Sequence, residues 1–319
     1  MASQATSSST RLADGIAGLV AGSAGVLMGH PIDTVRVRVI VGGKSPLEAA
    51  SWALRTQGLK GFYRGVIPPL VTNGIVGTTV FSALEAGKRF LRPHVEAGAL
   101  DERAALAMAG AFAGAVVSLV STPPQVLKVR MQTHALSAAA AGAEAAPRPR
   151  GGELRATGAA LGELLRRRGP LGLYTAYRAQ LLCESVGRMT YYLTYETAKG
   201  ALMRLRTGSE PLRARPLDPV AGVSLPERML AGACAGCVGW TVTFPFDVAR
   251  NRLVSQGDAL PPRYRGVLHC LLTSVREEGP RVLFRGLGVT LLRAGPVAMT
   301  VLPTFDLVRE FLAAHLEQP

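Results

Sequence analysis

Aromatic and acidic residues are both scarce in this chain of 319 residues. Phe, Trp and Tyr make up 6% of it, and 22 Asp and Glu stand against 36 Lys and Arg, which gives a net charge of +14. Such a basic chain can bind nucleic acid, but no nucleic-acid motif accompanies the charge and few rings are present to stack on bases. Attraction to an anionic lipid surface explains the charge better, so we expect no nucleic-acid partner.

Cysteine and histidine are also few, at four and five residues. Cys234 and Cys237 have the spacing of some metal ligands, but they lie in a run of small apolar residues and no second ligand pair follows. We interpret them as helix-packing residues and expect no metal. No catalytic triad, phosphate-binding loop or pair of catalytic carboxylates occurs either. The sequence therefore predicts a protein that is not an enzyme and has no cofactor.

The chain does contain long apolar segments with polar interruptions. It is 48% hydrophobic with a mean hydropathy of +0.22, which suits membrane helices that each keep a polar face. Its length alone would also permit a soluble helical protein of two domains. The first ten residues, MASQATSSST, have no apolar core, so we expect no secretory signal peptide, and a single base at Arg11 gives little support for a transit peptide.

One stretch, GHPIDTVRVR at 29–38, returns in outline as PPQVLKVR at 123–130 and PFDVARNR at 245–252. Each copy ends an apolar, Gly/Ala-rich run about as long as a membrane is thick. Charges at such a depth need a partner or water, so three copies favour a membrane protein over a soluble one. A proline inside a helix removes a backbone donor and kinks the helix. The predicted kinks lie at Pro31, Pro123 and Pro245.

The threefold pattern Pro-x-Asp-x-x-Lys/Arg-x-Arg resembles the signature of the mitochondrial carrier family, over roughly residues 12–315. The resemblance implies an all-α membrane protein with six transmembrane helices, in three pseudo-symmetric repeats around a central cavity, and with short amphipathic helices on the matrix side. It also implies the mitochondrial inner membrane, although the sequence alone leaves a peroxisomal or plastid membrane open. The first copy looks most like the branch that carries acylcarnitine and basic amino acids.

The repeats divide the chain into consecutive segments. These are a polar tail 1–11, repeat one 12–98, repeat two 99–206, a linker 207–223 and repeat three 224–319. Repeat two contains a low-complexity insertion at 134–152, which we interpret as a loop without a binding role. Small-residue stripes such as Gly110-x-x-x-Gly114 predict close helix packing. Six spans would place both termini on one side of the membrane.

The resemblance implies a charge network that closes the matrix side. Its members are the motif residues Asp33, Arg36, Gln125, Lys128, Asp247 and Arg250. Cyclic pairing would join Asp33 to Lys128, Asp247 to Arg36, and Gln125 to Arg250. Because Gln125 replaces an acid, one ion pair becomes a hydrogen bond and the gate weakens. Gln132 resembles the residue that braces this gate in the family.

A second network is implied at the cytoplasmic ends of the even helices. Its members are Glu85, Lys88, Tyr195, Glu196, Lys199, Asp306 and Arg309. An acid and a base three residues apart can pair within one helix, which is the alternative for any single copy. Three copies at equivalent positions favour pairing between helices instead.

The substrate site is predicted by counting back from the second network. Twelve or thirteen residues before its acids, about 18–20 Å along each helix, lie Thr72, Asn73, Cys183, Glu184 and Arg293. Arg293 would bind a carboxylate and Glu184 an ammonium group. Cys183 stands where the family has an Arg. Arg188, one turn from Glu184, either compensates for that Arg or pairs with Glu184 and leaves it unavailable.

We therefore expect a transporter that alternates between two salt-bridge networks, acting as an antiporter or a uniporter. A basic or zwitterionic amino acid, or an acylcarnitine-like molecule, fits the predicted site. The alternatives are a carrier of other carboxylates, with Arg188 and Arg293 as an anion site, and a carrier-like scaffold that binds proteins.

The resemblance further implies a monomer that binds cardiolipin phosphates where the short helices begin and where Tyr63-Arg64-Gly65 and Phe284-Arg285-Gly286 follow them. Repeat two has Tyr174-Thr175-Ala176 instead, without base or glycine, so we expect one weaker lipid site.

Overall fold

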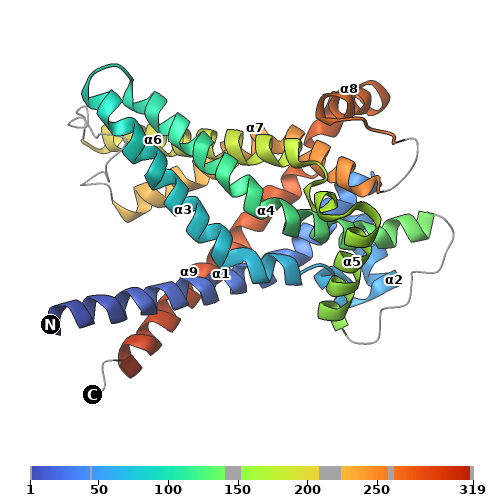
Figure 1. Cartoon of the computed structure of the whole chain (residues 1–319), viewed down its shortest axis with the longest axis horizontal. Coiled ribbons are helices and arrows are strands. Elements are labelled where there is room, and N and C mark those ends of the chain that lie inside the picture. The colour runs from blue at the N-terminus through green and yellow to red at the C-terminus, as the bar shows by residue number, and fades with distance from the viewer. Residues whose placement is uncertain (1, 44, 141–151, 208–223, 258–261, 317–319) are drawn as a thin grey trace. The chain divides into compact units, whose positions relative to one another are not determined.

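A computed structural model of the chain describes residues 2–43, 45–140, 152–207, 224–257 and 262–316, and every regular element in these ranges is a helix. The same order occurs three times: a long helix, a short helix, a 3₁₀ turn and a second long helix (Figure 1). The long helices are α1 (Ala2–Gly42), α3 (Ile67–Glu96), α4 (Glu102–Ala140), α6 (Tyr177–Thr207), α7 (Leu225–Ser255) and α9 (Leu287–Leu316). The short ones are α2 (Pro46–Gln57), α5 (Gly152–Arg168) and α8 (Val267–Glu278). The predicted all-helical repeat architecture is confirmed.

The predicted kink prolines all lie inside long helices. Pro31 is in α1, Pro123 is followed by Pro124 in α4, and Pro245 is in α7. None of these prolines ends its helix. The charged residues of each motif therefore lie on the same long helix as the proline that precedes them.

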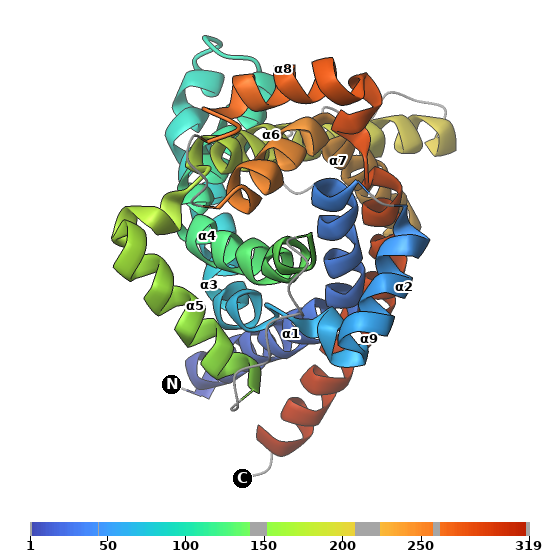
Figure 2. The same cartoon turned by 90° about the vertical axis from the view of Figure 1, so that its right-hand side faces the viewer.

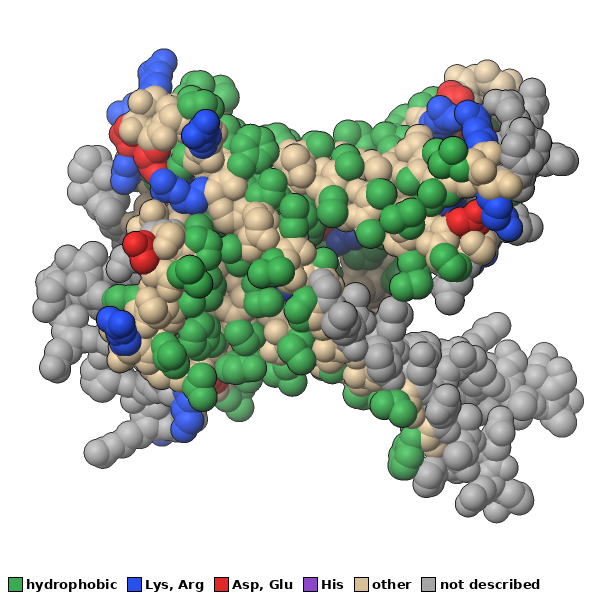
Figure 3. All heavy atoms as spheres, turned by 180° about the vertical axis from the view of Figure 1, so that it is seen from behind, with side chains coloured by type: hydrophobic (Ala, Val, Ile, Leu, Met, Phe, Trp, Pro, Cys, Tyr) green, Lys and Arg blue, Asp and Glu red, His purple; other side chains and the backbone are tan. Residues whose placement is uncertain are grey.

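Four stretches of the described residues are long and apolar enough to cross a membrane. They are Ile16–Gly42, Leu59–Glu96, Glu102–Thr133 and Pro226–Ser255. Helix α6 is more polar, because charged residues such as Glu184, Arg188 and Glu196 recur along it. Hydrophobic side chains cover the sides of the long helices, and charged ones gather near the helix ends (Figure 3). Phe81 and Phe90 of α3 are 70% and 73% exposed, which suits contact with lipid and not with water.

Packing divides the helices into two units. Unit 1 comprises Met1–Gly74, Leu127–Gly169 and Gly288–Pro319, and unit 2 comprises Ile75–Val126 and Pro170–Leu287. Each unit therefore contains parts of more than one sequence repeat.

In unit 1, glycines on α1 allow close contact with two other helices. A Cβ atom at Gly22 would lie 2.3 Å from Asn73 Nδ2 of α3, and one at Gly25 would lie 2.5 Å from Val301 of α9. The short helix α2 packs beside the C-terminal end of α1 (Figure 2). The start of α1 and the end of α9 lie at the same end of unit 1 in both ribbon views (Figures 1 and 2), as an even number of spans requires.

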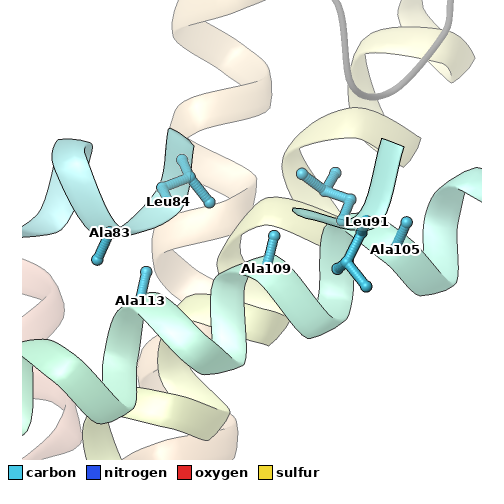
Figure 4. Close-up of a cluster of buried hydrophobic side chains, with 7 residues drawn as sticks. Ala83, Leu84, Leu91, Ala105, Ala109 and Ala113 are labelled. Carbon is cyan, nitrogen blue, oxygen red and sulfur yellow. The ribbon is translucent and has the colours of Figure 1, made fainter. Parts of the chain in front are cut away.

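In unit 2, α4 packs tightly against α3 and α6. Small and large side chains alternate at the α3–α4 contact, where Ala83, Leu84 and Leu91 face alanines of α4 (Figure 4). The predicted stripe at Gly110 and Gly114 meets the backbone of α6, since a Cβ atom at Gly114 would lie 2.3 Å from a carbonyl oxygen of that helix. Helices α6 and α7 also pack against each other.

The three 3₁₀ turns each end near a residue with a left-handed backbone. Gly65, Ala176 and Gly286 occupy equivalent places, with φ of 81°, 64° and 94°. Glycine adopts this conformation freely, whereas an L-residue with a Cβ atom is strained in it. Repeat two therefore carries a local backbone strain that the other two repeats avoid.

We expect Gly114→Ala to destabilise the protein, because the added methyl group forces α4 and α6 apart. Overpacking of this kind costs about 1–3 kcal/mol. The measurement is the melting temperature of the purified protein in detergent. Gly236→Ala is the matched control, since within the described chain nothing lies within 4 Å of a Cβ atom there. Equal melting temperatures for the two variants would contradict the close α4–α6 contact.

We expect Ala176→Gly to stabilise the protein by about 0.5–1 kcal/mol. It removes a left-handed alanine, which costs about 1–2 kcal/mol, and the greater freedom of glycine in the unfolded chain offsets part of the gain. The same melting assay measures it. Ala179→Gly, in a buried and regular part of α6, should shift the melting temperature in the opposite direction; a loss of stability at both positions would mean that the Ala176 backbone is unstrained.

Candidate functional site

One carboxylate oxygen in unit 1 holds two bases from different helices. Lys128 Nζ of α4 lies 2.7 Å from Asp33 Oδ2 of α1, and Arg293 Nη1 of α9 lies 3.2 Å from the same atom. Asp33 is 8% exposed, so this acid is a buried junction of three helices. The expected Asp33–Lys128 pair is present. Arg293, which the sequence predicts to bind substrate, also binds this acid of the first network. Arg36, the other base of that network in unit 1, is as buried as Asp33.

Hydrogen bonds next to this junction fix α1 to its surroundings in unit 1. Gln132 Nε2 donates to Thr34 Oγ1 at 3.1 Å, and Thr34 Oγ1 donates to the carbonyl oxygen of Phe62 at 2.7 Å. His30 Nε2 lies 3.1 Å from the carbonyl oxygen of Arg64. Gln132 thus bridges α4 and α1 directly beside Asp33, the place expected for a brace, and it does so through Thr34, which the sequence analysis missed.

In repeats one and three, the last base of the motif binds the end of the following short helix. In repeat three, Arg252 donates to Glu278 and to Ser274, and Glu278 also binds Arg285 at 2.9 Å. The hydrogen bond from Arg252 holds the pKa of the Glu278 carboxyl below its usual range.

Repeat one has an amide in place of that carboxylate. Arg38, 1% exposed, donates to Gln57 Oε1 at 2.7 Å and to the carbonyl oxygen of Gly61 at 3.4 Å. Its guanidinium lies 5.4 Å from the centroid of the Trp52 ring, a cation–π contact. Two of its nitrogens, Nε and Nη1, have no hydrogen-bond partner in the described part of the chain. A buried cation here lacks the carboxylate that its counterpart in repeat three has.

In unit 2, the predicted substrate residues of α6 bind each other. Arg188 Nη2 lies 2.9 Å from Glu184 Oε2, and both side chains stay partly accessible, at 25% and 21%. Cys183 beside them is half-buried. Of the two roles considered for Arg188, pairing with Glu184 is the one that the structure shows.

The matrix-network residues of unit 2 make contacts that the sequence did not predict. Arg250 forms an ion pair with Asp247 of its own helix α7, and Asn251 Nδ2 donates to Asp247 Oδ2 at 3.2 Å. An amide that the sequence analysis missed also binds Arg250: Gln180 Oε1 of α6 lies 2.8 Å from Arg250 Nη1. The reason is packing, because α7 lies against α6.

The second network is also paired differently from our expectation. Lys88 binds Glu85 at 3.2 Å and Lys199 binds Glu196 at 2.7 Å, each within its own helix. Lys199 Nζ lies 4.7 Å from the centroid of the Tyr195 ring as well. These two copies adopt the within-helix alternative, which the spacing of three residues allows. The side chains of Asp306 and Arg309 lie outside the described residues.

The remaining predicted substrate residues, on α3, contact the protein itself. Thr72 Oγ1 donates to the carbonyl oxygen of Pro68 at 2.8 Å. The Asn73 amide packs against Gly22, as described above. Both side chains thus have structural contacts whether or not they meet a substrate.

The backbone donor expected to bind a lipid phosphate in repeat one already has a partner. Gly65 N donates to Glu153 Oε2 at 3.3 Å, and Glu153 lies in the first turn of α5. A carboxylate of the chain therefore occupies the place of the anion there.

Comparison with known proteins agrees with this architecture. The sequence profile of the family described as "Mitochondrial carrier protein" matches residues 7–95, 102–206 and 222–316. The chain belongs to the mitochondrial carrier family. It is accordingly a solute transporter and a multi-pass protein of the mitochondrial inner membrane.

Similar curated proteins cover almost the whole chain. "Solute carrier family 25 member 47-B" of Danio rerio is 36% identical over 305 residues, which are 94% of this chain and 99% of that protein. "Mitochondrial basic amino acids transporter" of Bos taurus is 32% identical over 93% of this chain and 91% of its own length. "Solute carrier family 25 member 48" of Bos taurus is 30% identical over 93% and 94%.

The sequence analysis missed Gln180 because the other two repeats have a different residue at this position. Gln180 follows Ala176 by four residues, and the residues four after Gly65 and Gly286 are Pro69 and Thr290. A search for threefold patterns therefore found no signal at this position.

We expect Gln57→Glu to stabilise the protein by about 1–2 kcal/mol, because it gives the buried Arg38 a carboxylate of unchanged size. The measurement is the melting temperature at neutral pH. Glu278→Gln is the reciprocal variant and should lower it, since it leaves Arg252 in the situation of Arg38. A lower melting temperature for Gln57→Glu would show that Arg38 already has sufficient charge compensation.

Proposed function

We propose that this carrier transports a small cationic or zwitterionic molecule that bears a carboxylate, such as a basic amino acid or an acylcarnitine-like molecule. What supports this proposal is that two charged residues predicted from the sequence to bind substrate, a base in unit 1 and an acid in unit 2, each have a partner that a substrate could replace. Arg293 is 29% exposed and is bound to Asp33, and Glu184 is 21% exposed and is bound to Arg188. The relatives named "Mitochondrial basic amino acids transporter" support this substrate class.

Charged groups of such a substrate would exchange with these partners, at Arg293 within unit 1 and at Glu184 within unit 2. A substrate carboxylate on Arg293 replaces Asp33, which leaves Asp33 with Lys128 alone. A substrate ammonium group on Glu184 replaces Arg188. Asp33 keeps an ion pair in this exchange, whereas Arg188 gives up its carboxylate to the substrate, and the new ion pair at Glu184 offsets that loss.

Transport would proceed by alternating access between the two networks. The Asp33–Lys128 pair supports an engaged matrix network. The within-helix pairs of Glu85 and Glu196 support a disengaged cytoplasmic network, since those acids are occupied locally. Substrate binding shifts the balance by weakening one set of contacts while the other set forms. The protein is proposed to act as a monomer, by antiport or uniport.

Anionic lipid is the second proposed partner, with cardiolipin as the candidate. The basic residues near the short helices support it. The Glu153 carboxylate on Gly65 N and the absence of base and glycine at Thr175 and Ala176 support weaker binding at two of the three places.

One observation favours a second candidate function. If the Glu184–Arg188 pair persists during transport, Glu184 is neutralised and Arg293 remains as the accessible charge. The protein would then carry a carboxylate without an ammonium group. Glu184→Gln separates the two functions, because it should abolish uptake of a cationic substrate and spare uptake of a dicarboxylate.

The test is uptake by the purified protein in liposomes. Arginine, ornithine, carnitine, an acylcarnitine and a dicarboxylate are each offered outside, with and without the same panel loaded inside. We expect uptake of a cationic or zwitterionic member, and dependence on internal substrate distinguishes antiport from uniport. Uptake of the dicarboxylate alone would establish the second function, and no uptake by folded protein would favour a carrier-like scaffold.

We expect Arg293→Ala to reduce that uptake at least about tenfold, because a charge-assisted hydrogen bond to the substrate carboxylate is worth about 1.5–3 kcal/mol. The measurement is the initial rate in liposomes with matched protein content. Arg281→Ala removes an exposed base of the same type and should leave the rate unchanged. A wild-type rate for Arg293→Ala would exclude Arg293 from the substrate site.

A further inference from the structure

The amide of Gln180 is buried and hydrogen-bonded at both ends. The residue is 1% exposed. Its Oε1 accepts a hydrogen bond from Arg250 Nη1 at 2.8 Å, and its Nε2 donates to Glu184 Oε1 at 3.1 Å and to Ser121 Oγ at 3.0 Å. One side chain of α6 thereby contacts a base of α7, a hydroxyl of α4 and an acid one turn further along α6.

The chemistry of these partners fixes the orientation of the amide. A guanidinium only donates and a carboxylate only accepts, so the carbonyl oxygen of Gln180 must face Arg250 and its NH₂ group must face Glu184. The amide dipole thus lies head to tail between a cation and an anion, where each charge polarises it in the same sense. Arg250 and Glu184 are linked as an ion pair with one amide inserted.

The amide of this link comes from the repeat that has lost its motif acid. Gln125 stands where the other repeats have Asp33 and Asp247, and Gln180 of the same repeat supplies an amide that binds Arg250. The equivalent positions in repeats one and three, Pro69 and Thr290, have no amide side chain. An amide at this position is therefore particular to repeat two, and through it repeat two contacts Arg250 of repeat three.

We propose that Gln180 is a positioning residue that couples the substrate acid Glu184 to the gate base Arg250. This inference rests on the proposed function, since it gives Glu184 a substrate. When an ammonium group binds Glu184, the carboxylate holds the NH₂ end of the amide less strongly, and the carbonyl end binds Arg250 less strongly in turn. Occupation of Glu184 thus weakens the contacts of the gate, and by linkage an altered gate changes the affinity of Glu184 by the same factor.

The coupling is testable without any substrate. Glu184→Gln and Arg250→Gln are made singly and together, and the melting temperatures of the purified proteins form a double-mutant cycle. We expect the double variant to depart from the sum of the single shifts by about 2 °C or more. The departure should vanish in a Gln180→Leu background and persist in a Ser121→Ala background, which removes only the third hydrogen bond of the same amide. Additive shifts with Gln180 intact would overturn the relay.

A charge swap separates positioning from simple structural support. Gln180→Glu keeps the bond to Arg250 but opposes Glu184 with a like charge, so we expect a lower melting temperature. Adding Glu184→Gln removes the like-charge contact and gives the exchanged order of base, acid and amide, so it should recover most of the lost stability. Uptake of the cationic substrate should stay at least about tenfold below wild type, because the acid has left its place. Recovery of uptake together with stability would show that Gln180 has only a structural role.

The melting-temperature cycle and the uptake assay together distinguish this inference from the proposed function. A protein that shows the coupling in the melting cycle but takes up no member of the panel refutes the proposed function and keeps the relay. A protein that transports but melts additively keeps the function and refutes the relay.

Discussion

A charge placed inside a membrane helix must find a partner, and this requirement governs the structure around each motif. Asp33 satisfies it with two bases at once, Lys128 and Arg293, on a single oxygen. Because the two cations share one acceptor and repel each other, the loss of one is compensated by a tighter hold on the other. The junction can therefore change partners in steps, without passing through a state in which the buried acid has none.

Repeats one and three meet the same requirement with different chemistry. The last motif base has a carboxylate in repeat three, Glu278, but an amide in repeat one, Gln57. The base Arg250 takes an amide from α6. Amide partners bind a buried base less strongly than carboxylates. In the proposed transport cycle the gate contact of Arg250 has to break, and an amide partner there lowers the free energy that substrate binding has to supply.

Features common to the repeats could be predicted from the sequence, and features that break the repeat symmetry could not. The order of long and short helices and the Asp33–Lys128 pair follow from a pattern that occurs three times. Gln180 and Thr34 did not stand out, because their roles depend on which helices pack together. The spacing of Glu196 and Lys199 permits pairing within or between helices, and side-chain geometry alone decides between them. Ala176 shows the same limit, since its strain is a property of φ and not of composition.

Through the contact between Arg38 and Trp52, tryptophan fluorescence can report on the packing of α2 on α1. The chain has two tryptophans, so the ring beside Arg38 contributes a large share of the ultraviolet emission. A cation 5.4 Å from the ring centroid alters the energy and the lifetime of the excited indole. Any movement of α2 away from the end of α1 during transport would change that emission, which gives the protein an intrinsic optical reporter on this contact.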